Sequence, residues 1–158
     1  MQPLRPTVSL LHLPTGMNEV GLLLDSSVLI AQERRGLDAR TAITVIAKSN
    51  PSDDVSVSVV SLMELAHGIA RANSEQIMKR RTTFIRELLS SIPILGIDNQ
   101  LALKIGIMDG QLAQTGIRIP IEDLIIGVTA MENGFDVLTK NVRHFRMIPG
   151  LVVHEYVS

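Results

Sequence analysis

The sequence predicts a single α/β domain, in which a mostly parallel central sheet of four to five strands carries helices on both faces as a three-layer sandwich. The chain has 158 residues, the size of one ordinary domain. Short aliphatic runs alternate with segments of helical periodicity, a pattern typical of parallel strands joined by helical crossovers. No repeat, low-complexity tract or linker interrupts this alternation.

The first half of the domain contains two predicted strands. The run Gly21 to Asp25 (GLLLD) is continuously aliphatic and ends in a turn-forming acid, as expected for a buried parallel strand. The stretch 55–60 (VSVSVV) alternates like a strand. Helical periodicity predicts four helices around them, over residues 26–34, 38–48, 61–72 and 74–90.

The second half continues the same pattern. Residues 93–97 predict a weak strand, and a helix capped by Asp98 or Asn99 runs to Gln114. Pro120 begins another helix, and Gly134 ends it. The last predicted elements are a strand over 135–138, a short helix over 141–147 and a strand over 151–154. Residues 1–19 are interpreted as an irregular N-terminal extension, so the domain spans residues 20–158.

Composition excludes several classes of protein. The chain has no cysteine, which removes disulfide scaffolds, thiolate zinc sites and cysteine nucleophiles and suits the cytoplasm. Aromatic residues are only 3%, too few for a sheet that stacks bases. The net charge of −1 disfavours a generic duplex binder. Acids interrupt the most apolar segments, so no membrane span is expected.

Four polar residues follow or begin elements that should meet at one edge of the sheet. Asp25 ends the first strand, Glu64 follows the second, Asp123 lies in the first turn of the Pro120 helix, and Asn141 follows the fourth strand. Ligands of parallel sheets usually bind at this carboxyl edge. We therefore expect these four side chains to converge as a catalytic group.

Each residue also has a structural explanation when taken alone. Asp25 and Asn141 could be helix N-caps. Ser61 and Glu64 form the S-x-x-E pattern of a capping box, and Asp123 suits the positive end of a helix dipole. The four in combination favour a functional site, because carboxylates beside apolar segments are costly unless a cation meets them. An all-oxygen ligand set of Asp25, Glu64 and Asp123 selects Mg²⁺, with Mn²⁺ as a substitute, rather than Zn²⁺. Such an ion can polarise a water for phosphodiester attack.

Other acidic α/β classes lack their motifs here. The sequence has no D-x-D of phosphatase or Toprim type, and neither a Walker loop nor G-x-G-x-x-G. A receiver domain would need an acidic pair at the first strand, where Asp25 instead follows leucines.

Four segments, in order and spacing, give the sequence a resemblance to a known family. They are LLLDSSVLIA, SVVSLMELAHG, IPIEDLIIGVTAMENG and VLTKNVRHFRMIPGL. The sequence resembles the PIN-domain ribonucleases, and within them the VapC-type toxins of toxin–antitoxin pairs, over roughly residues 20 to 155. The resemblance implies a PIN-like fold and metal-dependent cleavage of single-stranded or looped RNA, with a cognate antitoxin as partner.

The same resemblance implies roles for individual residues. Asp25, Glu64 and Asp123 match the three metal-binding acids, and Asn141 matches a fourth position that is often Asp. Ser27 and Thr139 match positions that orient the site or the substrate.

Cations beside the acids bear on RNA binding. Lys140 and Arg143 could hold RNA at the rim of the acidic pocket, or could be solvated. A second basic group lies on the predicted long helix and comprises Lys79, Arg80, Arg81 and Arg86. We interpret this group as a solvated helix face rather than an RNA-binding one. His67 and His144 are assigned to the surface or to packing rather than to catalysis.

Two further possibilities concern partners. The alternative to an enzyme is a catalytically silent module whose acidic pocket receives a metal or a basic residue of a protein partner. The apolar content of 46%, like the family resemblance, suggests a homodimer formed through aliphatic helix faces.

Overall fold

One parallel sheet forms the centre of the molecule. The computed structural model describes residues 20–50, 52 and 54–157, and the predicted extension over residues 1–19 lies outside them. The strands pair in the order β3-β2-β1-β4-β5, all parallel. They are β1 (Gly21–Leu24), β2 (Val55–Ser58), β3 (Ile94–Leu95), β4 (Phe135–Thr139) and β5 (Val153–Glu155).

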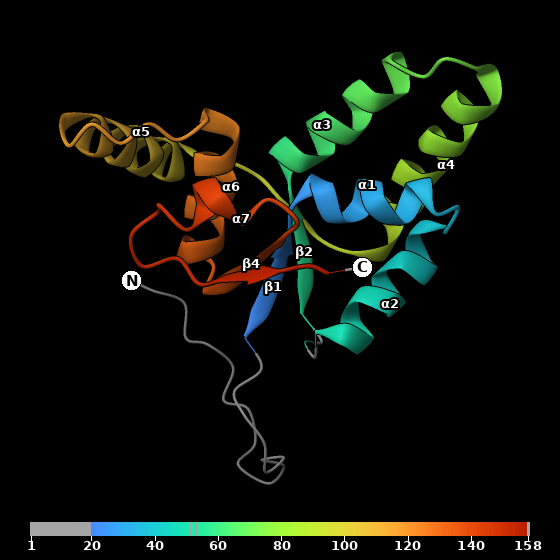
Figure 1. Ribbon diagram of the computed structural model, residues 1–158, viewed down its shortest axis with the longest axis horizontal. Coiled ribbons are helices and arrows are strands. Elements are labelled where there is room, and N and C mark those ends of the chain that lie inside the picture. The colour runs from blue at the N-terminus through green and yellow to red at the C-terminus, as the bar shows by residue number, and fades with distance from the viewer. Residues whose placement is uncertain (1–19, 51, 53, 158) are drawn as a thin grey trace, which may run out of the picture.

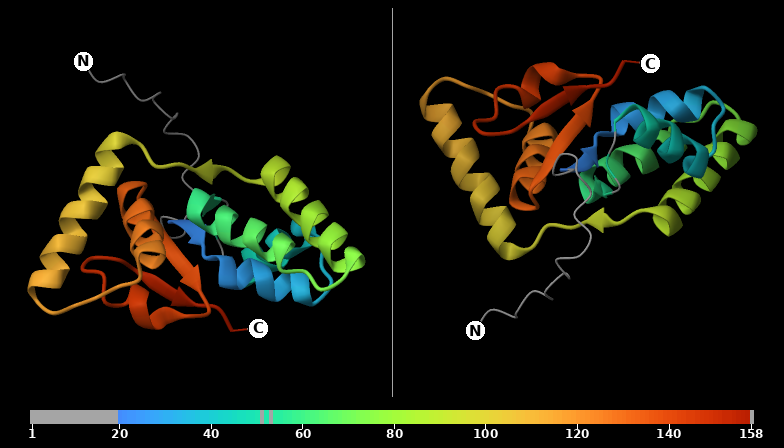
Figure 2. Two further views of the ribbon diagram at one scale, coloured as in Figure 1. Left: turned by 90° about the horizontal axis from the view of Figure 1, so that it is seen from above. Right: turned by 90° about the horizontal axis from the view of Figure 1, so that it is seen from below.

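Helices cover both sides of this sheet, which confirms the predicted three-layer sandwich (Figure 1). They are α1 (Ser26–Arg34), α2 (Ala39–Ser49), α3 (Val59–Ala70), α4 (Glu75–Ser91), α5 (Asn99–Gln114), α6 (Ile121–Glu132) and α7 (Val142–Phe145). Helices α5, α6 and α7 lie on one side, whereas α1, α2 and α4 lie on the other, as the views from above and below also show (Figure 2). Among the described residues, no helix combines the length and the apolarity that a membrane crossing requires.

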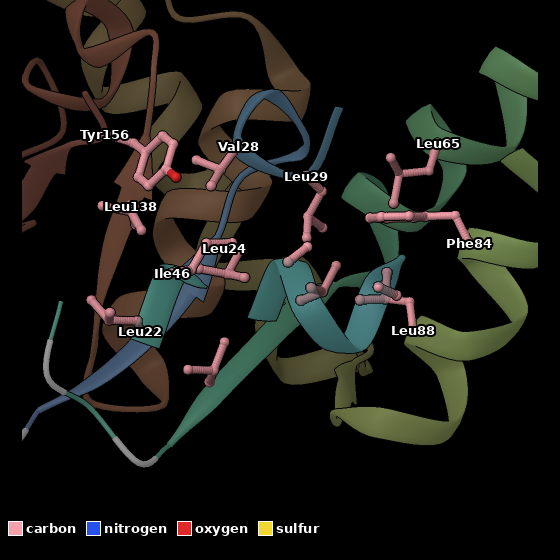
Figure 3. Close-up of a cluster of buried hydrophobic side chains, with 14 residues drawn as sticks. Leu22, Leu24, Val28, Leu29, Ile46, Leu65, Phe84, Leu88, Leu138 and Tyr156 are labelled. Atoms are coloured by element: carbon pink, nitrogen blue, oxygen red, sulfur yellow. The ribbon is translucent and has the colours of Figure 1, made fainter. Parts of the chain in front are cut away.

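Two apolar clusters fix the helices to the sheet. Alternate residues of β1 point to opposite faces, so Leu22 and Leu24 join one cluster and Leu23 joins the other. The first cluster packs β1 and β2 against α1, α2 and α4, with Phe84 and Leu88 at its far side (Figure 3). The second cluster packs α5, α6 and α7 against the other face. Both clusters hold the helices that begin at the carboxyl edge of the sheet.

The predicted start of the third helix is wrong by two residues. The helix α3 begins at Val59, because the Ser58 hydroxyl caps it by accepting a hydrogen bond from the Val60 N–H at 3.1 Å. Ser61 is therefore a buried residue inside the helix, and the S-x-x-E pattern is not a capping box. Glu64 lies in the second turn, where capping does not explain it.

The strand register brings the expected site residues to one edge. Leu24 of β1 pairs with Val57 of β2 and with Leu138 of β4. The residues that follow these three positions, Asp25, Ser58 and Thr139, consequently lie at the carboxyl ends of adjacent strands. Helix α6 flanks these strand ends on one side and α1 and α3 flank them on the other (Figure 1).

Candidate active site

Asp25 lies at the centre of the carboxyl edge and is almost fully buried. It occupies the N-cap position of α1, but its side chain makes no capping hydrogen bond. Its Oδ2 instead accepts hydrogen bonds from the Ser27 hydroxyl at 2.7 Å and the Thr139 hydroxyl at 2.8 Å. The explanation of Asp25 as a helix cap is therefore wrong, and two hydroxyl groups from α1 and β4 hold the carboxylate in place.

Thr139 is the junction between Asp25 and the segment that follows β4. Its side chain is fully buried, and its hydroxyl also accepts a hydrogen bond from the Asn141 N–H at 2.9 Å. The Lys140 N–H donates to the Ser27 hydroxyl at 3.1 Å. These bonds tie the turn between β4 and α7 to the Asp25 site.

Glu64 reaches the same region from the second turn of α3. Its Oε2 accepts a hydrogen bond from the buried Ser26 hydroxyl of α1. The bond connects the start of α1 to α3 and orients the Glu64 carboxylate.

Asp123 enters from the first turn of α6, on the opposite side of the strand ends. Its Oδ2 lies 2.9 Å from Nδ1 of His144 in α7. An ionised carboxylate only accepts hydrogen bonds, so the imidazole is the donor. Phe145, the neighbour of His144, is fully buried and anchors α7.

These residues surround one open cleft of about 750 Å³, a volume in the range of ligand-binding sites. All of the sequence-predicted site residues except Thr139 line it, and Thr139 lies directly beneath it through its bond to Asp25. The lining comprises Asp25, Ser26, Ser27, Ile30, Glu64, Pro120, Asp123, Lys140, Asn141, Val142, Arg143 and His144. The structure thus brings the four polar residues to one place, with two cations at the rim.

The carboxylates influence one another electrostatically. Burial raises the pKa of Glu64, the Ser26 hydrogen bond lowers it, and the charges of Asp25, Asp123 and Glu122 raise it further, with an upward net shift. The pKa of Asp123 is also raised, first by burial and then by Asp25 and Glu122, against the lowering effect of His144. Both shifts mean that the ionised cluster is costly without a cation.

The residues fit a hard divalent cation in donor chemistry. The three carboxylates supply only oxygen ligands, which suits Mg²⁺ or Mn²⁺. As the side chains stand, however, no three acidic or histidine residues in the described part of the chain are gathered closely enough to hold one ion. An ion held by all three carboxylates would therefore need their side chains to move closer together across the cleft.

Two cleft residues were missed from the sequence. Ser26 looked like an ordinary first residue of a helix, and His144 was assigned to the surface or to packing. The role of Ser26 comes from its contact with Glu64, and that of His144 from its contact with Asp123. Both contacts join residues that are distant in the sequence, and helical periodicity gives no signal for them.

The second basic group lies outside this cleft. Lys79 pairs with Glu75 at 2.9 Å, Arg80 with Glu33 at 2.8 Å, and Arg81 donates to the Gly68 carbonyl at 2.5 Å. Only the Lys79 pair is fully on the surface, whereas Arg80 pairs with the buried Glu33 and Arg81 is part-buried, so the prediction of a solvated face is wrong for these two residues.

A family comparison and a search of curated proteins both find matches. The model of the PIN domain family matches residues 22–151. The "Ribonuclease VapC" of Rickettsia bellii is 31% identical, over 85% of this chain and 95% of its own. The "tRNA(fMet)-specific endonuclease VapC" of Salmonella typhimurium is 28% identical, over 63% of this chain and 74% of its own.

Solved structures agree on the fold. The DNA-bound VapBC of Salmonella typhimurium contains a chain that superposes with a TM-score of 0.71 at 23% identity, covering 87% of this chain and 99% of that one. VapBC2 of Rickettsia felis, bound to a promoter DNA fragment, gives 0.70 at 20% identity, with 86% and 98% covered.

Proposed function

The chain belongs to the PIN domain family, among relatives named VapC ribonucleases, and we propose that it is a Mg²⁺-dependent endoribonuclease, the toxin of a toxin–antitoxin pair. One observation carries the proposal. The carboxylates of Asp25, Glu64 and Asp123 line one cleft at the carboxyl edge of the sheet. Ligands of parallel sheets usually bind at this edge, and carboxylate oxygens suit an ion that activates water for phosphodiester hydrolysis. Cytoplasmic location is part of this proposal.

The ion would be held by Asp25, Glu64 and Asp123, with Mn²⁺ as a substitute. When bound, it supplies a polarised water and neutralises charge on the phosphate. Asn141 is a neutral member of the cleft lining, so the ligand set carries three negative charges rather than four. Ser27 and Thr139 keep the central carboxylate oriented through the hydrogen bonds described above.

RNA is the proposed substrate, single-stranded or looped. Lys140 and Arg143 are exposed at the rim, beside the acids. Their charges would hold phosphates that the acidic centre itself repels. The Salmonella typhimurium relative is named for cleavage of tRNA(fMet), which supports tRNA as the first substrate to test.

A protein partner is the second part of the proposal. The structural neighbours are VapBC complexes, and a cognate antitoxin is proposed to bind this chain as well. A half-buried acidic cleft is suited to receive a basic side chain of such a partner, which would block metal and RNA together.

Self-association is proposed through the outer face of α5. Leu103 and Ile107 are 67% and 61% exposed there, four residues apart and hence on one helix face. Light scattering at micromolar concentration should give about twice the 17.3 kDa mass of one chain, and Ile107→Glu should reduce it to one. A single-chain mass for the unaltered protein would contradict the dimer.

The second candidate function is a catalytically silent binding module. The observation in its favour is that Glu64 and Asp123 are already engaged by Ser26 and His144. In that case the cleft would bind a metal or a basic partner side chain without cutting RNA.

Cleavage by the partner-free protein separates the two functions. The purified chain is incubated with a tRNA mixture and Mg²⁺ or Mn²⁺, and products are resolved on a denaturing gel. We expect metal-dependent fragments that disappear in Asp25→Asn and persist in Asp136→Asn, whose carboxylate pairs with His154 outside the cleft. Intact RNA with either metal, together with normal growth of cells that express the chain, would favour the silent module.

A further inference from the structure

The three cleft carboxylates share one bonding pattern. Each is held through a single oxygen: Oδ2 of Asp25 by two hydroxyls, Oε2 of Glu64 by Ser26, and Oδ2 of Asp123 by His144. Within the described residues, the second oxygen of each carboxylate accepts no hydrogen bond from the protein. Every acid is therefore anchored on one side and left with an oxygen that an ion can use.

Resting on the proposed metal-dependent function, we propose that Ser26 and His144 are positioning residues, which orient Glu64 and Asp123 for the metal as Ser27 and Thr139 orient Asp25. Metal-binding carboxylates are commonly held by hydrogen bonds from neighbouring groups, and loss of such a group typically weakens metal binding about 10–100-fold.

Ser26 is suited to this role because its position in α1 and its burial restrict where its hydroxyl can lie. It is the first residue of α1, and it is 4% exposed. A hydroxyl in such a place needs a partner inside the protein, and Glu64 supplies it from α3. The bond fixes a long and flexible side chain that would otherwise sample several rotamers in the cleft.

His144 performs the same task on the other side. The buried Phe145 and Ile148 fix the backbone around it, so Nδ1 is presented to Asp123 by a packed segment. The Asp123–His144 pair is partly exposed, with side chains 24% and 37% accessible, which leaves the carboxylate reachable from the cleft.

A structural role and a positioning role predict different results for matched substitutions. Ser26→Ala and His144→Ala remove the donors. Ser26→Thr retains the hydroxyl, and His144→Asn can place an amide N–H near the position of Nδ1. His154→Ala is the control, since His154 forms a comparable pair with Asp136 at 2.7 Å but lies outside the cleft.

Binding of Mn²⁺ alone, followed by the electron paramagnetic resonance signal of the free ion, measures the effect without RNA cleavage. We expect roughly 10-fold weaker binding or more in both alanine variants, near-normal binding in Ser26→Thr and His144→Asn, and no change in His154→Ala. Thermal unfolding in EDTA shows whether each variant is folded.

Several outcomes would overturn the inference. The inference is wrong if the folded alanine variants bind Mn²⁺ as tightly as the unaltered chain. It is also wrong if they bind Mn²⁺ more tightly, because the hydroxyl and imidazole donors would then compete with the ion. An unaltered chain that binds no Mn²⁺ would remove both the metal site and the inference. One that binds Mn²⁺ but cuts no RNA would remove the proposed function alone.

Discussion

The hydroxyl of Thr139 offers the sharpest test of how the Asp25 site is built. Thr139→Val replaces the hydroxyl with a methyl of nearly the same size at a fully buried position. The substitution removes the hydrogen bond donated to Asp25 at 2.8 Å and the acceptor of the Asn141 N–H at 2.9 Å. Packing volume is nearly unchanged, so the loss reports on the hydrogen bonds.

The expected cost follows from these two bonds. A hydrogen bond to a charged group contributes about 1.5–3 kcal/mol and a neutral one about 0.5–1.5 kcal/mol. Asp25 retains the bond from Ser27, and Asn141 is exposed enough for water to replace its partner, so both contributions fall near their lower limits. We expect a loss of about 2–3 kcal/mol in the free energy of unfolding, which lowers the midpoint of a domain this size by about 4–12 °C.

Urea and thermal unfolding in EDTA measure this cost, and the same experiments with Mg²⁺ measure the metal's contribution. Thr139→Ser is the matched control: it loses a buried methyl, about 1 kcal/mol, but keeps the donor to Asp25. We expect stabilisation by Mg²⁺ to survive in Thr139→Ser and to decrease in Thr139→Val. A valine variant within about 0.5 kcal/mol of the unaltered protein, or one with full stabilisation by Mg²⁺, would refute the reasoning.

Three further predictions concern the acids and the rim. Mg²⁺ at about 100 times its Kd should stabilise the fold by about 2.7 kcal/mol, and Asp25→Asn together with Asp123→Asn should abolish the difference in midpoint between Mg²⁺ and EDTA. The folded pKa of Glu64 lies above its ordinary value, so the folded state holds the proton longer as pH rises, and the metal-free fold loses stability through that window. Glu64→Gln should therefore gain free energy of unfolding relative to the unaltered chain as pH rises above 4.5, the ordinary pKa of the glutamate, whereas a difference constant with pH would contradict the raised pKa. Lys140→Gln and Arg143→Gln should each lower the salt dependence of RNA binding in EDTA by about 0.7 in the slope of log K against log salt, and unchanged slopes would place RNA elsewhere.

Local sequence signals predicted the fold well, because each signal has a local physical cause. An aliphatic run defined β1, Asp98 caps α5 by accepting from the Leu101 N–H at 2.8 Å, and Gly134 ends α6 with a positive φ of 69°. The boundary of α3 was wrong because Ser58 and Ser61 are both acceptable caps, and only the length of β2 decides between them.

The site was predicted in part for the same reason. Parallel topology alone brings Asp25 and Thr139 to one edge, so their proximity follows from the strand pattern. The bonds of Ser26 to Glu64 and of His144 to Asp123 span 38 and 21 residues. They depend on how α3 and α7 pack, which the sequence pattern does not specify.

The corrected start of α3 changes the interpretation of Glu64. As a capping-box residue, Glu64 would stabilise the helix locally and need no other explanation. In the second turn it has no backbone N–H to accept from, and its pKa is raised first by its partial burial and then by neighbouring negative charges. The Ser26 hydroxyl offsets only part of this cost, because it supplies a hydrogen bond without a positive charge.

In the described cleft, the cations Lys140 and Arg143 lie at the rim, and the histidine pairs with Asp123 rather than with Glu64. Within this cleft, a cation from outside the chain, either a metal or a basic side chain of a partner, would therefore offset the cost of the Glu64 charge.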